Sequence, residues 1–264
     1  MLLQSETTYI DSDMISGEEI HLAVSSLAKS FDGRGVILDD VSFSIKKGDA
    51  VALIGGNGSG KSTLLRCCLR LVEPDRGEIS LLGMPVTSLR RSPLRALRSR
   101  VGLIFQRHNL VPRLTVLSNV IHGSMNSGWG FRRWRQGFAP AEIREQAIGC
   151  LEKVGLPHLA NSRADQLSGG ESQRVAIARA LMQKPDFIMA DEPVASLDPK
   201  VGREVMDLFV NLIKTENITF LFVSHDLEHA LTYSNRLMAM KDGVLHLNGE
   251  TKDYQTADLH EIYG

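Results

Sequence analysis

The sequence has few cysteines and no long hydrophobic run. Three cysteines in 264 residues do not make a disulfide framework, and Cys67 and Cys68 are neighbours in a segment of helical character, so we expect free thiols in a reducing compartment. The apolar stretches Val51–Ile54 and Phe220–Val223 are far shorter than the roughly 20 residues that span a bilayer. The first part of the chain is acidic and has no lysine or arginine before Lys29, which argues against a signal peptide. We therefore expect a chain that does not cross a membrane by itself.

An excess of charge of either sign is also missing. Lysine and arginine number 30 against 31 aspartate and glutamate, so the net charge of -1 gives no overall attraction to nucleic acid or to anionic lipid. A hydrophobic content of 43% is typical of a globular protein. The composition predicts no nucleic-acid partner, and any basic surface has to be local.

One long segment does have a strong local bias. Between Ile79 and Ala141 the sequence contains ten arginines and no acidic residue. Both tryptophans lie in this segment, where Trp129 and Trp134 alternate with arginines. Arginine with aromatic residues is typical of an interface or a membrane-surface contact, whereas a surface loop with buried aromatics is the plainer alternative. The arginines and remaining aromatics of this cluster are Phe131, Arg132, Arg133, Arg135 and Phe138.

The order of apolar and polar segments predicts an α/β protein. Residues 1–18 are polar and acidic and predict a flexible tail before a single domain at 19–264. Helical stretches separate the later apolar runs, which predicts buried parallel strands. Residues 107–185 have a different character and include a helical stretch at 140–155, so we expect a helical subdomain inserted into the α/β core. The predicted strands are Ile20–Leu27, Val41–Ile45, Asp49–Ile54, Val101–Phe105, Phe187–Ala190 and Ile218–Val223.

A glycine-rich loop directly follows the strand that ends at Ile54. The glycines allow consecutive backbone N–H groups to point at a phosphate, and a helix that starts near Lys61 adds the positive end of its dipole. Lys61 would neutralise phosphate oxygens, and the Ser62 hydroxyl would bind Mg²⁺. A glycine-rich turn with a chance lysine is the plainer alternative, but the strand before it and the helix after it favour a P-loop. The residues that match the P-loop pattern are Gly55, Gly56, Asn57, Gly58, Ser59, Gly60, Lys61, Ser62 and Thr63.

Two adjacent carboxylates follow the strand Phe187–Ala190. A carboxylate at the end of a buried strand beside the P-loop strand is suited to the magnesium shell, and a second one next to it can polarise an attacking water. We predict Asp191 as the metal residue and Glu192 as the general base. By itself the pair is a weak signal, because strands that leave a core often meet charged residues.

The segment Leu167–Glu171, with the sequence Leu-Ser-Gly-Gly-Glu, comes before a helical run predicted at Ser172–Met182. Together with the P-loop and Asp191 it resembles the signature motif of ATP-binding cassette (ABC) ATPases, which usually ends in glutamine. The resemblance covers about Ile20 to Gly249. It implies a P-loop NTPase core with a mainly parallel sheet, an antiparallel β subdomain and an inserted helical subdomain. It also implies that Ser168, Gly169, Gly170 and Glu171 cap the γ-phosphate of ATP held by a second subunit.

Further positions match the family in the same order. The resemblance assigns adenine stacking to Phe31, magnesium contact and sensing of the membrane partner to Gln106, and γ-phosphate binding to His225. It places Asp198 in the Ser196–Asp198 loop that crosses the dimer interface. Taken singly, Phe31, Gln106 and His225 would be a core aromatic, a surface amide and a satisfied strand-end histidine. The predicted catalytic residues are Gln106, Glu192 and His225; the predicted magnesium ligands are Ser62, Gln106 and Asp191.

The resemblance also implies a cellular role. The amino-acid sequences of Phe105–Leu114, Arg163–Leu167 and Ala190–Pro199 are similar to those of the ATP-binding subunits of phosphonate importers, the branch that also serves phosphite. Such a subunit binds ATP and Mg²⁺, forms a homodimer on the cytoplasmic face of the inner membrane, and works with two membrane-spanning permease subunits and a solute-binding protein. A motor for another solute or for export, and an accessory ATPase of a carbon–phosphorus lyase complex, remain alternatives.

Two other classes fit less well. A cassette ATPase of DNA repair or translation would need a long coiled-coil insertion or a second cassette in the chain, and the sequence has neither. A P-loop kinase has no use for the segment Leu167–Glu171. The motifs together therefore favour a transport ATPase.

Overall fold

The computed structural model describes residues 18–33, 35–106, 108–124, 137, 139–256 and 259. The tail predicted at 1–18 lies outside the described residues except for Glu18, and the cluster of tryptophans and arginines between 129 and 138 lies outside them as well. In the described part of the chain, no helix combines the length and the apolar character needed to cross a membrane.

A six-stranded sheet forms the centre of the molecule. Five of its strands are parallel, and only the edge strand β10 runs antiparallel, against β9. All five residues of β8 are buried, as expected for a parallel strand covered on both faces. In spatial order the strands are β10 (Val244–Glu250), β9 (Arg236–Lys241), β3 (Ala50–Gly55), β8 (Thr219–Val223), β7 (Phe187–Asp191) and β6 (Val101–Phe105).

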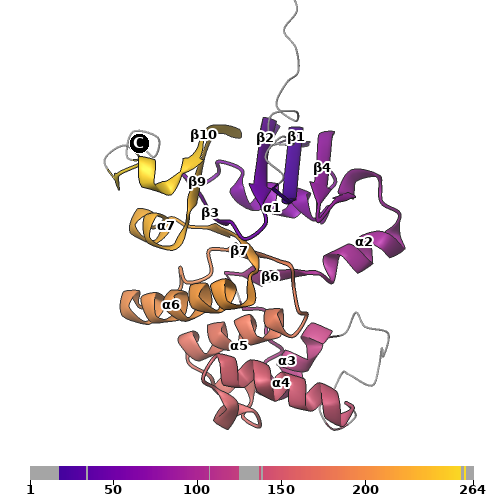
Figure 1. The fold of residues 1–264 in the computed structure, drawn as a ribbon, viewed down its shortest axis with the longest axis vertical. Coiled ribbons are helices and arrows are strands. Elements are labelled where there is room, and N and C mark those ends of the chain that lie inside the picture. Colours follow the sequence, from indigo (N-terminus) through magenta and orange to yellow (C-terminus); the bar gives the residue numbers. More distant parts are fainter. Residues whose placement is uncertain are drawn as a thin grey trace, which may run out of the picture.

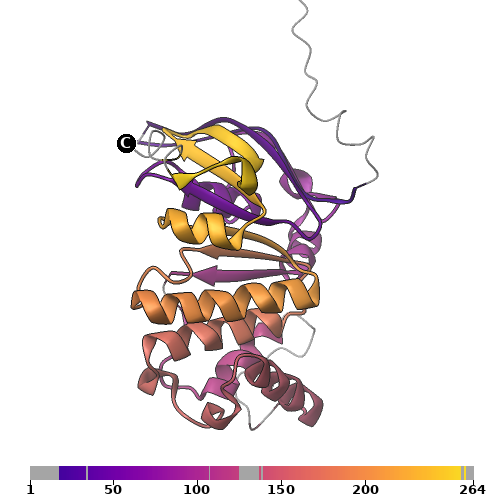
Figure 2. The same ribbon diagram turned by 60° about the vertical axis from the view of Figure 1, so that its left-hand side comes forward.

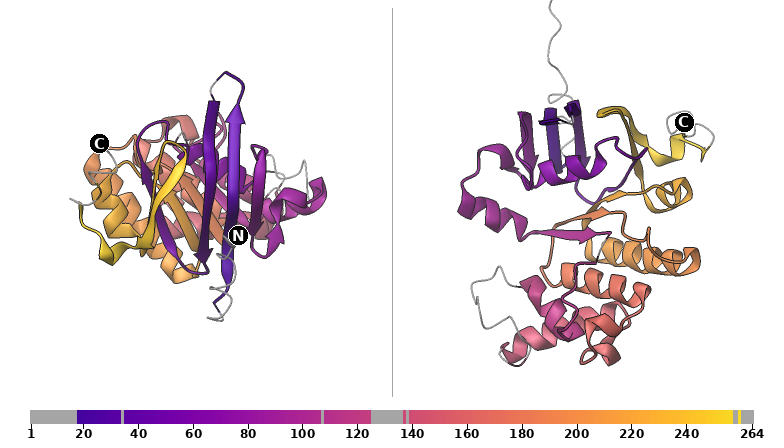
Figure 3. Two further views of the ribbon diagram at one scale, coloured as in Figure 1. Left: turned by 90° about the horizontal axis from the view of Figure 1, so that it is seen from above. Right: turned by 180° about the vertical axis from the view of Figure 1, so that it is seen from behind.

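A second sheet is antiparallel and lies at one end of the molecule (Figure 1). Its spatial order is β2 (Gly35–Lys46), β1 (Ile20–Phe31), β4 (Arg76–Leu81) and β5 (Met84–Pro85). Helix α1 (Lys61–Cys68) packs between the two sheets, and its buried side chains share one hydrophobic core with both. The free thiols of Cys67 and Cys68 are part of this core. The long hairpin of β1 and β2 is seen from above in Figure 3.

Among the described residues between β6 and β7, three α-helices gather at the end opposite the antiparallel sheet (Figure 1). They are α3 (Val116–Ile121), α4 (Ala141–Lys153) and α5 (Gly169–Leu181). Helix α6 (Pro199–Glu216) lies between α5 and the six-stranded sheet (Figure 2). Helix α2 (Arg91–Arg98) precedes β6, and α7 (Leu227–Tyr233) covers β3. Short 3₁₀ turns occupy Val86–Ser88, His122–Ser124, Pro157–Leu159, Ala164–Gln166 and Thr251–Asp253.

The predicted fold class is confirmed: a mainly parallel sheet, an antiparallel β region and helices between β6 and β7 are all present. Several predicted boundaries were wrong. β1 and β2 are longer than predicted, and Ile218 precedes β8 instead of opening it. The helix predicted from Ser172 begins at Gly169, because Ser168 and Glu171 form a capping box that starts the helix earlier.

Candidate functional site

The parallel sheet brings four distant segments to one edge. The strands β3, β8, β7 and β6 are neighbours, and their carboxyl ends point the same way. The P-loop follows β3 and Gln106 follows β6. Asp191 is the last residue of β7, Glu192 follows it, and His225 follows β8. Ligands in open α/β sheets bind outside the carboxyl ends of the strands. This edge is therefore the candidate site.

Within the P-loop, the Lys61 side chain is only 6% exposed. Its Nζ donates 2.8 Å hydrogen bonds to the carbonyl oxygens of Gly55 and Gly56. Burial lowers the pKa of Lys61, while the nearby carboxylates of Glu192 and Asp191 act in the opposite direction. The ammonium is thus fixed inside the loop with two neutral acceptors, which an anion can replace.

The path of the P-loop depends on glycine. Gly55 and Gly60 have φ values of 148° and 100°. A Cβ on Gly55 would lie 2.2 Å from the Met240 carbonyl oxygen, so no other residue fits there. Gly60 precedes the first residue of α1 and offers no side-chain cap to its N–H groups. Those groups can bind a phosphate.

Ser62, on the first turn of α1, meets Asp191 at the end of β7. Its hydroxyl donates a 3.0 Å hydrogen bond to Asp191 Oδ1. Burial raises the pKa of Asp191, and the hydrogen bond from Ser62 opposes that shift. A hydroxyl and a partly buried carboxylate are oxygen ligands of the kind that Mg²⁺ prefers, so these residues fit the ion predicted from the sequence.

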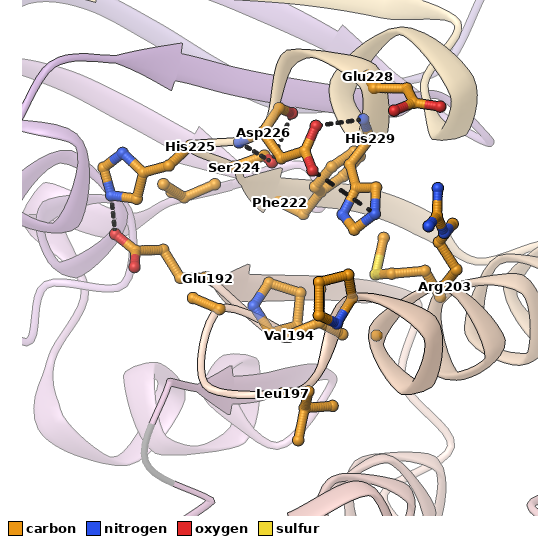
Figure 4. Close-up of a pocket in the computed structure, with 16 residues that line it drawn as sticks. Glu192, Val194, Leu197, Arg203, Phe222, Ser224, His225, Asp226, Glu228 and His229 are labelled. Atoms are coloured by element: carbon orange, nitrogen blue, oxygen red, sulfur yellow. Dashed lines mark hydrogen bonds and ion pairs between the residues drawn. The ribbon is translucent and has the colours of Figure 1, made fainter.

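Glu192 and His225 form a pair across β7 and β8. Glu192 Oε1 and His225 Nε2 are hydrogen-bonded. Glu192 has a φ of 52°, which is uncommon for a residue other than glycine and marks a constrained turn at the end of the strand. Both side chains line a cavity of about 580 Å³ that continues between the α6 and α7 segments, where Arg203 and His229 also line it (Figure 4). A carboxylate held by an imidazole can accept a proton from water.

Ser168 to Glu171 lie in another part of the molecule. Ser168 is the N-cap of α5, and Glu171 Oε2 accepts hydrogen bonds from the Ser168 N–H at 2.8 Å and its hydroxyl at 2.7 Å. These hydrogen bonds lower the pKa of Glu171. A Cβ on Gly170 would lie 2.6 Å from Val201 Cγ1 of α6, so the turn packs closely against that helix. In Figure 1, α6 and the six-stranded sheet separate α5 from α1, so these four residues are not joined to the P-loop of their own chain.

The remaining predicted residues lie around this frame. Phe31 is 38% exposed at the end of β1, with Lys29 Nζ 5.1 Å from its ring centroid. Asp198 is the N-cap of α6 and accepts a 2.9 Å hydrogen bond from the Lys200 N–H. Gln106 is exposed and lines a groove of about 620 Å³ together with residues of the segments 108–112, 164–165, 172 and 196.

Sequence reasoning missed Arg179 of α5. Its Nη1 donates to the Asn109 carbonyl oxygen at 2.7 Å and its Nη2 to the His108 carbonyl oxygen at 2.8 Å. Arg179 therefore holds the loop that follows Gln106. The available signal was a single charge in the apolar run Val175–Leu181, where an arginine is unexpected without a partner.

Comparisons with known proteins agree with this geometry. The family model described as ABC transporter matches residues 38–195. The phosphonates import ATP-binding protein PhnC of Alcaligenes faecalis is 42% identical over 243 residues, which cover 92% of this chain and 88% of the relative. The protein of the same name from Wolinella succinogenes is also 42% identical over 243 residues, with the same coverage of both chains.

Two solved structures are similar over most of their length. One is cbiO1 from Clostridium perfringens, described as part of the ABC transporter complex cbiONQ; its TM-score is 0.79 at 31% identity, over 89% of this chain and 90% of that one. The other is the ATP-binding cassette MJ0796, described as a dimer in a post-hydrolysis state bound to ADP and Pi; its TM-score is 0.75 at 33% identity, over 87% of this chain and 98% of that one.

Proposed function

The chain belongs to the ABC transporter family, and from this we propose that it is the ATP-hydrolysing subunit of an importer for phosphonates or a related phosphorus oxyanion such as phosphite. The phosphonate assignment rests on one observation, the 42% identity over 92% of the chain with relatives named for phosphonate import. The hydrolytic role is supported by Lys61, the Ser62–Asp191 pair and the Glu192–His225 pair at one sheet edge.

ATP binding uses the P-loop and Phe31. The exposed ring of Phe31 stacks on adenine, and the N–H groups from Gly56 to Thr63 bind phosphate oxygens. Lys61 exchanges its two carbonyl acceptors for phosphate oxygens, which are stronger acceptors for an ammonium. The turn stays compact because its glycines admit close backbone contacts.

Ser62, Asp191 and Gln106 would hold Mg²⁺. When bound, the ion neutralises charge on the β- and γ-phosphates. In the described part of the chain, no three histidine, cysteine, aspartate or glutamate side chains gather into a group that could hold a metal ion. Phosphate oxygens of the nucleotide would supply further oxygen ligands.

Hydrolysis requires a base beside the γ-phosphate. Glu192 takes a proton from the attacking water, whose oxygen forms the new bond to phosphorus while the bond to the ADP oxygen breaks. In the nucleotide-free chain His225 holds the Glu192 carboxylate through an Nε2–H hydrogen bond. When ATP binds, the same N–H would turn to the γ-phosphate and leave the carboxylate to the attacking water. The constrained backbone of Glu192 limits the positions that the carboxylate can take.

Two copies of the chain act together. Ser168, Gly169, Gly170 and Glu171 of one copy cap the nucleotide held by the other, and the loop with Asp198 crosses between the copies. The dimer reported for the related cassette MJ0796 supports this arrangement. Two permease subunits and a solute-binding protein complete the importer, which places the chain at the cytoplasmic face of the membrane. In this proposal residues 19–264 form one domain, with the helical subdomain at about 107–185.

The test separates transport from later chemistry. A strain lacking the gene is supplied with phosphate, phosphite or methylphosphonate as its sole phosphorus source, and uptake of labelled methylphosphonate is measured within seconds to minutes. We expect normal growth on phosphate and loss of rapid methylphosphonate uptake, restored by the wild-type gene and not by Glu192→Gln. Normal uptake with failed cleavage would indicate an accessory ATPase of a carbon–phosphorus lyase instead, and normal uptake with failed excretion would indicate an exporter.

A further inference from the structure

The loop that follows Gln106 is hydrogen-bonded to the helical region at three places. Arg179 of α5 donates to the carbonyl oxygens of His108 and Asn109. Asn119 of α3, which is fully buried, accepts from the Val111 N–H at 2.7 Å and donates to the Val111 carbonyl oxygen at 3.2 Å. Further along, the carbonyl oxygens of residues 112 and 114 accept N–H bonds from residues 165 and 164 at 3.0 Å. The loop from 108 to 114 therefore belongs to the helical body.

Gln106 itself belongs to the other body. It directly follows β6, whose last residue Phe105 is paired with Asp191 in the six-stranded sheet. The chain thus passes from the sheet to the helical region between residues 106 and 108. The placement of the Gln106 side chain depends on how the helical body holds the loop, because only one residue separates Gln106 from the first carbonyl that Arg179 binds.

Arg179 differs from the other groups that hydrogen-bond to the loop in its charge and its location. A guanidinium offers a rigid fork of donors that can bind two carbonyl oxygens at once, and hydrogen bonds from a charged donor are stronger than neutral ones. It also lies on α5, the helix that begins at the Ser168 cap. The same helix therefore carries residues 168–171 at its N-terminal end and, about three turns later, Arg179, which binds the loop 108–114.

Two unsatisfied groups lie on the elements that Arg179 joins. Both polar side-chain atoms of Gln173 are buried without a hydrogen-bond partner among the described residues, and so is Nε2 of His108. Gln173 is on α5 and His108 is on the loop. Buried polar groups are normally paired with protein or with ordered water, so water can bind both side chains where the loop meets α5.

We propose that Arg179 is a positioning residue that makes the Gln106 loop follow helix α5, and so links the nucleotide site of its own chain to the signature end that serves the partner's nucleotide. This rests on the proposed function, because it needs Gln106 at the nucleotide and Ser168 at the nucleotide of the second copy. A shift of α5 at one nucleotide is then transmitted to Gln106 at the other.

The test compares two arginines of the same helix. Arg179→Lys keeps the charge but replaces the fork with one ammonium, and Arg174→Lys is the matched control on α5. His108→Ala is a second control, since it removes the side chain but keeps the carbonyl oxygen that Arg179 binds. The rate of amide hydrogen exchange in the peptide covering residues 108–114 measures how firmly Arg179 holds the loop, and it needs no nucleotide. We expect faster exchange in Arg179→Lys alone, with an unchanged thermal midpoint of unfolding.

Turnover provides the functional measurement. We expect kcat of Arg179→Lys to fall on the order of 10-fold or more while the affinity of the isolated subunit for ATP stays near wild type, because small misplacements of a contact group reduce the rate. The Mg²⁺ concentration for half-maximal rate should rise, as in Gln106→Ala. The double variant Gln106→Ala/Arg179→Lys should turn over no more slowly than the slower of the two single variants, because Arg179 acts through the Gln106 side chain.

The outcomes are distinct. Multiplying defects in the double variant, or unchanged exchange at residues 108–114, would overturn the role of Arg179. If wild type hydrolyses ATP and Glu192→Gln does not, the proposed function stands whatever Arg179→Lys does. An inactive wild type in the presence of its membrane partners would remove the proposed function and this link with it. Arg179→Met, which removes the charge as well as the fork, is a second variant; if it fails to fold, Arg179→Lys still decides the question.

Discussion

The Ser62 hydroxyl donates a 3.0 Å hydrogen bond to Oδ1 of Asp191, which lies 129 residues further along the chain. The contact joins the first turn of α1 to the end of β7. Burial raises the pKa of Asp191, so the ionised carboxylate destabilises the nucleotide-free fold. A bound cation would relieve that effect. The carboxylate that would bind Mg²⁺ therefore lowers the stability of the nucleotide-free protein.

Replacing Asp191 by Asn should therefore stabilise the nucleotide-free protein and abolish hydrolysis. The sign follows from the raised pKa: the penalty is absent below the pKa of the unfolded carboxyl, about 4, and grows as pH rises through the folded value. The gain in thermal midpoint of Asp191→Asn over wild type should thus be present at pH 7.5 and vanish towards pH 4, in EDTA. Wild type should gain stability from ATP with Mg²⁺, and the variant much less. A variant that is less stable than wild type at pH 7.5 would contradict the burial argument.

Glu192→Gln should retain ATP and lose turnover. The amide preserves the shape of the side chain and a hydrogen bond to His225 but cannot accept a proton, so kcat should fall by about 10²–10⁴. ATP should then accumulate in a closed dimer, visible by size-exclusion chromatography with light scattering. His225→Ala, which leaves the carboxylate in place, is the companion variant and should also hydrolyse slowly. Hydrolysis near the wild-type rate in Glu192→Gln would remove Glu192 from the role of general base.

The sequence anticipated the parts of the site that are encoded locally. The P-loop is a continuous motif, and the strand before Asp191 is apolar throughout, so their meeting at one sheet edge followed from parallel strands. Strand β10 escaped notice because it alternates at an exposed edge, and β9 because its buried residues, Leu237 to Met240, include no β-branched or aromatic side chain. The contacts of Arg179 were out of reach because they go to main-chain carbonyl oxygens, whose positions depend on the path of a loop and not on its residue types.

Acid should weaken the hydrogen bond between His21 of β1 and Thr219 of β8, which connects the two sheets. This side chain is 5% exposed, and its Nδ1 bonds the Thr219 hydroxyl at 2.7 Å, whose oxygen accepts from the Gly48 N–H at 2.9 Å. The Thr219 hydroxyl can donate only to an unprotonated Nδ1. Burial lowers the pKa of His21, against the effect of Glu19.

A lowered folded pKa means that His21 contributes stability above the unfolded value of about 6.5, and that this stability is lost as pH falls through the folded value. His21→Gln keeps an acceptor and removes the titration, so its thermal midpoint should fall less than that of wild type between pH 7.5 and pH 5. Thr219→Val tests the partner and should lower the midpoint at pH 7.5. Parallel curves for wild type and His21→Gln would show that other groups govern acid sensitivity.

Whether Ser168 serves its own nucleotide or the partner's can be decided by mixing two inactive variants. Ser168→Arg puts a bulky cation at the α5 cap, and Lys61→Ala removes the phosphate-binding ammonium; each should be inactive alone. In a mixed dimer, the P-loop of the Ser168→Arg chain faces the intact cap of the Lys61→Ala chain, so one of the two sites is complete. Equal amounts form mixed dimers half of the time, and independent sites should then give about a quarter of wild-type activity. If Ser168 acted on the nucleotide of its own chain, every site in the mixture would keep a defect, and no activity would return. Each variant alone must first show wild-type thermal stability, and Ser168→Arg must bind ATP normally, so that the return of activity reports the geometry of the dimer.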